Sequence, residues 1–150
     1  GLHVGAYHFF RFDSPGYMQA LNFLHSVRGK SFDMPLVVDI EEWTNPNDRT
    51  TERILIQLRE FISNVEDAGY KVMLYSNRDG YERFLSDNFR QYPLWIASFR
   101  GAPEGPWRLW QYTHVGSAKG TSGNIDVNTF NGTRDEWEAW LLETSTQHPQ

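Results

Sequence analysis

The 150-residue sequence contains no cysteine, which excludes disulfides, thiolate zinc sites and cysteine nucleophiles. It has no apolar run approaching the roughly 18 to 20 residues of a membrane-spanning helix, so we expect no membrane span. The net charge is −5 and no long basic run is present, which argues against a nucleic-acid surface. These absences are compatible with an enzyme that acts on small or polymeric substrates.

Signature motifs for several reaction classes are also missing. The sequence has no glycine-rich phosphate loop, and neither Ser76 nor Ser98 lies in the Gly-x-Ser-x-Gly context of a serine hydrolase. The histidines show no His-x-His or His-x-x-x-His spacing, and His8 alternates away from Tyr7 and Phe9. We therefore expect no metal site and no cofactor, and interpret the histidines as structural.

What the sequence does contain is an alternation of strand-length apolar runs with segments of helical period, in a chain of ordinary single-domain size. We expect strands at 2–10, 35–41, 71–77, 92–99, 107–113 and 124–130, and helices at 14–27, 50–70, 79–89 and 133–143. In the first helix Ser14 is the expected N-cap, and the apolar face is Tyr17, Leu21, Leu24 and Val27. In the second, the apolar face is Ile54, Leu55, Leu58, Phe61, Ile62 and Val65.

The order strand, helix, strand, helix predicts an α/β fold with parallel strands and right-handed crossovers. The first strands are apolar throughout, as expected of strands covered on both sides. The three late strands have only loops between them and break the pattern. No internal repeat or domain linker is visible.

The stretch "PLVVDIEEW" ends a buried strand with Asp39 and Glu41. Side chains two apart in a strand share a face, with Cα atoms roughly 6.5 Å apart. Because active sites of parallel α/β folds lie at carboxyl strand ends, the pair suits general acid and base catalysis. In the alternative, one acid caps the next helix and the other pairs with an arginine; the spacing leaves both open.

A third acid, Asp126, lies in the last predicted strand within "GNIDVNTF", and Asn128 falls on the same side. This pair either joins the acidic site or satisfies backbone groups of a turn.

Aromatic residues recur where the rim of the acidic site is expected. Flat rings at the mouth of an acidic cleft suit the C–H faces of sugars, although each ring taken singly also fits a core position. The candidate substrate-binding aromatics are Tyr7, Phe9, Tyr75, Trp95, Trp110 and Tyr112. We assign Trp137 and Trp140, in the last helix, to the core.

Six motifs in fixed order, "GAYHFF", "PLVVDIE", "LYSN", "YPLWIA", "LWQYT" and "GNIDVNTF", resemble glycoside hydrolase family 25, the Chalaropsis-type lysozymes. The likeness covers residues 2 to 142. It implies an irregular TIM-like barrel in which five βα units precede three strands with little helix. It also implies a bacterial or phage muramidase, secreted or wall-associated, that cleaves the β-1,4 bond between N-acetylmuramic acid and N-acetylglucosamine in peptidoglycan.

The resemblance also assigns roles to individual residues. Glu41 matches the family's proposed proton donor, Asp39 its acidic partner on the same strand, and Asp126 the acid of the last strand. Tyr7, Tyr75 and Trp110 match aromatic positions that line the substrate groove. The resemblance leaves the retaining and inverting outcomes open.

One departure from the family concerns the start of the sequence. The family opens with an Asp-Val-Ser strand and a second βα unit before the "GAYHF" motif, and nothing before Gly1 is present here. We therefore expect residues 1–150 to form a single glycosidase domain that lacks its first two βα units. The exposed barrel edges would favour self-association. Two other functions stay open: a non-catalytic glycan-binding module, and an inactive fragment that needs the missing strands.

Overall fold

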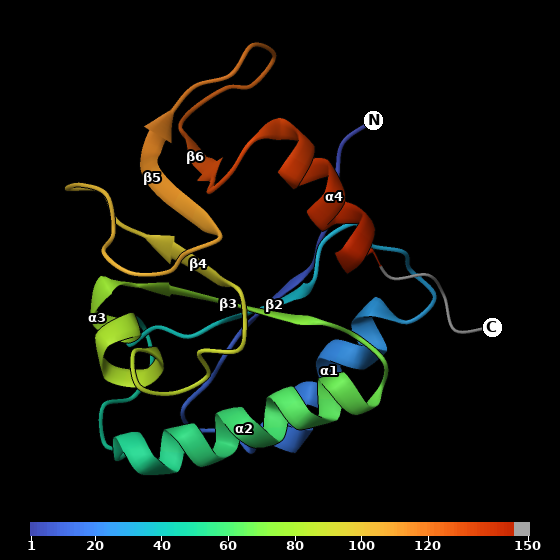
Figure 1. The fold of residues 1–150 in the computed structure, drawn as a ribbon. Helices are drawn as coiled ribbons and strands as arrows, with labels where there is room; N and C mark the ends of the chain where they lie inside the picture. The colour runs from blue at the N-terminus through green and yellow to red at the C-terminus, as the bar shows by residue number, and fades with distance from the viewer. Residues whose placement is uncertain (146–150) are drawn as a thin grey trace.

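The computed structural model describes residues 1–145 as one six-stranded sheet with helices on both faces (Figure 1). The elements are β1 (Tyr7–Phe9), α1 (Gly16–Val27), β2 (Leu36–Asp39), α2 (Thr51–Asp67), β3 (Val72–Asn77), α3 (Arg78–Gly80), the π-helix η1 (Tyr81–Leu85), β4 (Leu94–Ala97), β5 (Leu109–Gly116), β6 (Ile125–Phe130) and α4 (Arg134–Thr144). Within these residues, no helix is both long and apolar enough to cross a membrane.

The strands follow one another in the sheet in sequence order, from β1 to β6. The ladders from β1 through β5 are parallel, as predicted, but β6 runs antiparallel to β5. The short loop 117–124 joins these two strands as a hairpin, so the chain returns in the opposite direction. Among residues 1–145 the sheet does not close, and β1 and β6 form its two edges.

The first strand is shorter than the predicted 2–10. The backbone of Val4 pairs with the loop before β2: its N–H donates to Asp33 Oδ2 at 2.8 Å, and its carbonyl accepts from the Asp33 N–H at 2.9 Å. Leu2 is 93% exposed. The start of the chain therefore follows this loop, and the regular ladder begins only at Tyr7.

The beginning of α1 also differs from the prediction. Pro15, and not Ser14, is the N-cap residue, and no side chain caps the helix. The Gln19 amide donates instead to the carbonyls of Arg11 and Ser14, at 2.8 and 2.9 Å. The buried Gln19 side chain thus supplies the hydrogen bonds that the backbone carbonyls of the turn before α1 require.

The predicted apolar face of α1 is largely wrong, since Tyr17 and Leu21 are exposed. The buried residues are Gly16, Gln19, Ala20, Phe23 and Val27. A close helix contact explains the rotation, because a Cβ at Gly16 would lie 2.0 Å from the Gln57 carbonyl oxygen of α2. The small residue Gly16 allows α2 to approach closely, and Phe23 rather than Tyr17 or Leu21 supplies the side chain that packs on Phe61.

The predicted face of α2 is confirmed, because all six apolar residues named for it are buried. Thr50 caps the helix by accepting from the Arg53 N–H, and Gly69 beyond its end has φ of +91°. Figure 1 shows α1 and α2 side by side on one face of the sheet. Their apolar side chains form the larger core cluster with Phe10, Val38, Ile40 and Leu74.

The last helix lies on the other face (Figure 1). Trp140 and Leu141 of α4 pack on Val37, Met73 and Leu109, and Trp137 is partly buried beside them. The core assignment of both tryptophans is therefore confirmed. The carboxyl end of α4 is fixed to the segments that precede β2 and β3, by a hydrogen bond from Thr144 Oγ1 to the Asp33 carbonyl and by Lys71 Nζ donating to the Glu143 carbonyl. This helix thus covers the amino-terminal ends of the strands.

Candidate active site

Four of the predicted site residues form a row across the carboxyl ends of β1 to β4. In the parallel register, neighbouring strands pair Phe9 with Asp39, Asp39 with Tyr75, and Tyr75 with Trp95. Paired residues of adjacent strands point to the same side of a sheet. We call this side, which also carries α4, the Asp39 face. The rings of Tyr75 and Trp95 meet edge to face, with centroids 5.0 Å apart.

Asp39 is the least compensated of these groups. Its Oδ1 atom is buried, and within residues 1–145 it has no hydrogen-bond partner. Burial raises the pKa of Asp39 to about 8, and the negative charge of Glu41 adds to the effect. Asp39 therefore keeps a proton at neutral pH, next to a second carboxyl group.

Glu41, just beyond β2, is held by a residue that the sequence analysis did not single out. Asn77 Nδ2 donates to Glu41 Oε2 at 2.9 Å. Asn77 stands two residues after Tyr75, so the alternation of β3 already placed it on the same face. The arginine that pairs with an acid of this segment, Arg83, binds Glu42, and Thr50 caps the next helix. The alternative of one capping and one arginine-paired acid therefore does not describe Asp39 and Glu41.

Tyr75 links the pair to the third acid. Its hydroxyl donates to Gln111 Oε1 at 2.8 Å. Burial raises the pKa of Tyr75, and so do the negative charges of Glu41, Asp39 and Asp126, in that order. The charges of all three candidate acids thus act on one tyrosine hydroxyl, which stays protonated at neutral pH.

Gln111 is a second functional candidate that was missed. It is 6% exposed and pairs in register with Asn128 of β6. Asn128 in turn accepts from Trp95 Nε1 at 2.8 Å, which fixes the plane of that indole. Gln111 and Asn128 therefore orient the two aromatic rings beside the acids.

Trp110 lies on the face opposite Asp39, because it pairs with the buried Ile96. Its Nε1 donates to the Ser98 carbonyl at 2.8 Å, and its ring contacts Tyr112 at 5.8 Å. The two aromatics do share a face, as expected, but the structure does not bring them to the acids. The residue of "LWQYT" that points toward Tyr75 is Gln111.

Tyr7 and Phe9 lie on the Asp39 face at the edge strand. Tyr7 pairs with Val37 and is 70% exposed, whereas Phe9 is half-buried beside Asp39. Their neighbour His8 points to the other face, where it hydrogen-bonds Gln19 and stacks on Phe61, so its structural role is confirmed.

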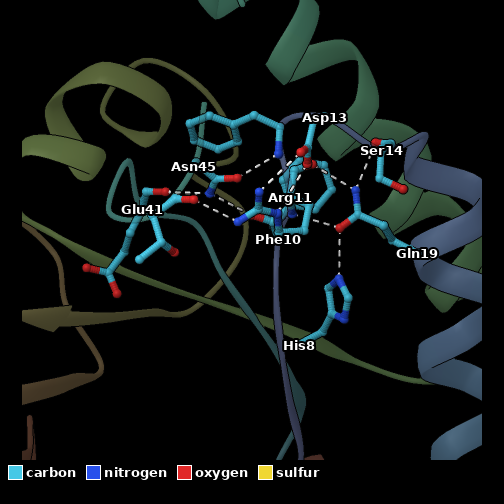
Figure 2. Close-up of polar contacts among 10 residues, drawn as sticks. His8, Phe10, Arg11, Asp13, Ser14, Gln19, Glu41 and Asn45 are labelled. Atoms are coloured by element: carbon cyan, nitrogen blue, oxygen red, sulfur yellow. Dashed lines mark hydrogen bonds and ion pairs between the residues drawn. The ribbon is translucent and has the colours of Figure 1, made fainter. Parts of the chain in front are cut away.

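The backbone that carries Glu41 is held by the network drawn in Figure 2. Asn45 Nδ2 donates to the carbonyls of Glu41 and Phe10, at 2.8 and 3.0 Å, and Asn45 Oδ1 accepts from the Phe12 N–H. Arg11 donates to the Thr44 carbonyl at 2.8 Å. Figure 2 shows the Glu41 carboxylate pointing away from Asn45. Asn45, in the loop after β2, thus ties the main chain of Glu41 to the loop after β1, and the Glu41 side chain is left to bond Asn77.

Two further observations concern metal binding and a large cavity. Within residues 1–145, no group of three or more acidic or histidine side chains has a metal-binding arrangement. A cavity of about 930 Å³ lies near the amino-terminal ends of β3 and β4, and its lining includes Tyr70, Tyr92 and Trp107 but none of the three acids. This cavity is therefore separate from the acid cluster.

Comparison with known proteins decides the family. The model of Glycosyl hydrolases family 25 matches residues 1–121. The chain belongs to this family. The match also confirms the resemblance described from the six motifs.

Individual relatives agree. The structure of a family 25 glycosyl hydrolase from Bacillus anthracis superposes with a TM-score of 0.83 and 36% identity, over 92% of this chain and 68% of that chain. Lysozyme M1 of Streptomyces globisporus is 32% identical over 152 residues, which covers 88% of this chain and 51% of that protein. Uncharacterized protein YegX of Escherichia coli O157:H7 is 32% identical over 145 residues, 94% of this chain and 53% of that protein.

The chain spans about half the length of the curated relatives it matches. The likeness to the solved structures confirms the predicted α/β class and TIM-like architecture, with the sheet open within residues 1–145.

Proposed function

We propose that this chain carries the carboxylate site of a peptidoglycan hydrolase that acts on cell walls. The observation that carries the proposal is the placement of Asp39 beside Tyr75 and of Glu41 beside Asn77 at the carboxyl ends of the neighbouring strands β2 and β3, with the charge of Asp126 acting on Tyr75 from β6. Relatives named as lysozymes support the substrate class.

The proposed bond is the β-1,4 linkage from N-acetylmuramic acid to N-acetylglucosamine. Cleavage needs a proton on the leaving oxygen and negative charge near the oxocarbenium-like carbon. The Asp39–Glu41 pair holds one proton, and Glu41, which is partly buried, transfers it to the leaving oxygen. A water molecule then adds to the sugar carbon and returns a proton to the pair. Asp126, on the separate strand β6, stabilises positive charge as the bond breaks.

The aromatic row suits a sugar polymer. Tyr75 and Trp95 lie edge to face beside the acids, and their polar atoms are already bonded to Gln111 and Asn128. Because those hydrogen bonds fix the rings, a sugar face meets a preorganised surface.

The test is incubation of the chain with purified peptidoglycan, followed by mass spectrometry of the released fragments. New reducing ends on N-acetylmuramic acid are expected. Reducing ends on N-acetylglucosamine would contradict the proposed bond.

A second candidate is glycan binding without cleavage, and the open edges of the sheet at β1 and β6 favour it. Retention of the chain on sedimented walls, with no fragments released, would support this candidate over hydrolysis.

A further inference from the structure

The Asn77 side chain uses both ends of its amide. Its Oδ1 accepts from the Gly80 N–H at 2.8 Å, and its Nδ2 donates to Glu41 Oε2 at 2.9 Å. A backbone N–H can bond only to the carbonyl end of the amide, so the first contact fixes the second. The NH₂ group of Asn77 must therefore face Glu41.

Gly80 makes this arrangement possible. A Cβ at Gly80 would lie 2.2 Å from Ser76 Oγ and 2.8 Å from the Ile40 carbonyl oxygen. Ser76 is fully buried, and its hydroxyl donates to that carbonyl at 2.6 Å. Because these atoms cannot move aside, only glycine lets α3 rest directly on the ends of β2 and β3.

The contact has a consequence for the proton of Glu41. An amide N–H that points at Oε2 repels a second hydrogen there, so a proton on this carboxyl group sits on Oε1. We propose that Asn77 is a positioning residue that occupies Oε2 of Glu41 and thereby selects Oε1 as the oxygen that transfers the proton. The inference rests on the proposed function and deepens it.

The charged and titratable groups around the contact come from four elements. Asp39 lies on β2 and Tyr75 on β3, and Asp126 acts from β6. Arg83 of η1 is bound to Glu42 and to Thr51 Oγ1, so its charge is directed away from Glu41. Asn77 donates to Oε2 of the Glu41 carboxylate, and the Asp39 carboxyl group also hydrogen-bonds with Glu41.

Two substitutions of Asn77 remove its hydrogen bond to Glu41 but keep an oxygen that can accept from the Gly80 N–H. Asn77→Asp keeps an acceptor for the Gly80 N–H but turns a carboxylate toward Glu41 Oε2. A proton is then shared between the new carboxylate at position 77 and Oε2 of Glu41, instead of lying on Oε1. The titration midpoint of the Asp39–Glu41 pair should therefore rise by about one pH unit or more. Asn77→Ser also keeps a capping oxygen but leaves Oε2 without a donor. It should lower kcat on the order of 10-fold to 100-fold with KM little changed.

The experiment combines wall lysis with carboxyl-carbon NMR titration of the wild type, N77D and N77S, and with N22D as a charge control on exposed α1. The expected result is the raised midpoint in N77D, lower kcat in both Asn77 variants, and wild-type behaviour of N22D. Wild-type kcat in N77S, or an unchanged midpoint in N77D, would overturn the proposal.

The two readouts also separate this inference from the proposed function. The titration does not require activity. If no variant or wild type cleaves walls but the N77D midpoint rises, the proposed function fails and the contact between Asn77 and the pair stands. If the wild type and both Asn77 variants cleave walls equally, the result supports the proposed hydrolysis and contradicts the proposed role of Asn77.

Discussion

Asp39 and Tyr75 are direct partners in the parallel register of β2 and β3, and the negative charge of Asp39 helps to raise the pKa of Tyr75. A buried carboxyl group with an unpaired oxygen thus lies beside a hydroxyl that is committed to Gln111. The pairing places two protonated groups side by side on the Asp39 face at neutral pH.

Removing the transferable proton should abolish cleavage and spare the fold. Glu41→Gln keeps the shape of the side chain and an acceptor for Asn77. Wall-lysis turnover should fall by a factor of roughly 10² or more. Turbidity clearing measures the rate, thermal melting checks the fold, and Glu60→Gln on exposed α2 is the matched control. Clearing by E41Q at the rate of E60Q would rule out the acid role.

Asp39 should matter for the rate more than for binding. Asp39→Asn removes the charge and proton of the pair, whose effect is greatest where positive charge develops on the sugar. We expect turnover at saturating substrate to drop, with glycan affinity within a few-fold of wild type. Affinity can be followed by tryptophan fluorescence, given Trp95 nearby. Collapse of affinity with an intact saturated rate would make Asp39 a binding residue instead.

The raised pKa of Asp39 also predicts how stability depends on pH. Between its ordinary value of 3.8 and about 8, the folded chain holds a proton that the unfolded chain has released. The free energy of unfolding should therefore be fully retained below pH 3.8 and decline as the pH rises toward about 8.

The decline should be on the order of a few kcal/mol, because each pKa unit corresponds to about 1.4 kcal/mol and local solvent reduces the effect. Urea unfolding from pH 4 to pH 8 measures it. Asp39→Asn should flatten the profile, whereas Asp67→Asn, on the exposed end of α2, should keep it. A wild-type stability that rises over this pH window would contradict the assignment.

The open edge at β1 predicts self-association of the 150-residue chain. Val4, beside this edge, is 51% exposed and the segment has no lysine to discourage strand addition. Light scattering should show oligomers that Val4→Lys reduces and that Val115→Lys, at a valine of β5 that is 60% exposed, does not. A monomeric and fully active 150-residue chain would disprove this view of the edge.

The sequence predicted the parts of the fold that strong periodicity dictates. The face of α2 was readable because six apolar residues recur at helical spacing, and the Asp39–Glu41 pair because alternation in a strand is strict. The face of α1 was not, since the approach of Gly16 to Gln57 is a tertiary contact that outweighs the apolar pattern.

The site was predictable to a similar degree. The three acids could be predicted from their positions at strand ends, but the side-chain amides of Asn77 and Gln111 could not. Asn77 acquires its role only through α3, and Gln111 was passed over because its aromatic neighbours suggested the opposite phase for β5. The reversal of β6 depends on a loop whose path has no local signal.

That reversal affects how the site assembles during folding. Asp126 is carried by a β5–β6 hairpin, whose partners are close in sequence, whereas Asp39 depends on ladders closed by helical crossovers. Hairpins form within microseconds, and pairings between distant segments are slower. Asp126 therefore lies on a hairpin that forms early, and it joins Asp39 and Glu41 only after the slower β3–β4–β5 ladder has formed. Transient opening of this ladder would disperse the acids while the α1–α2 layer keeps its helical structure.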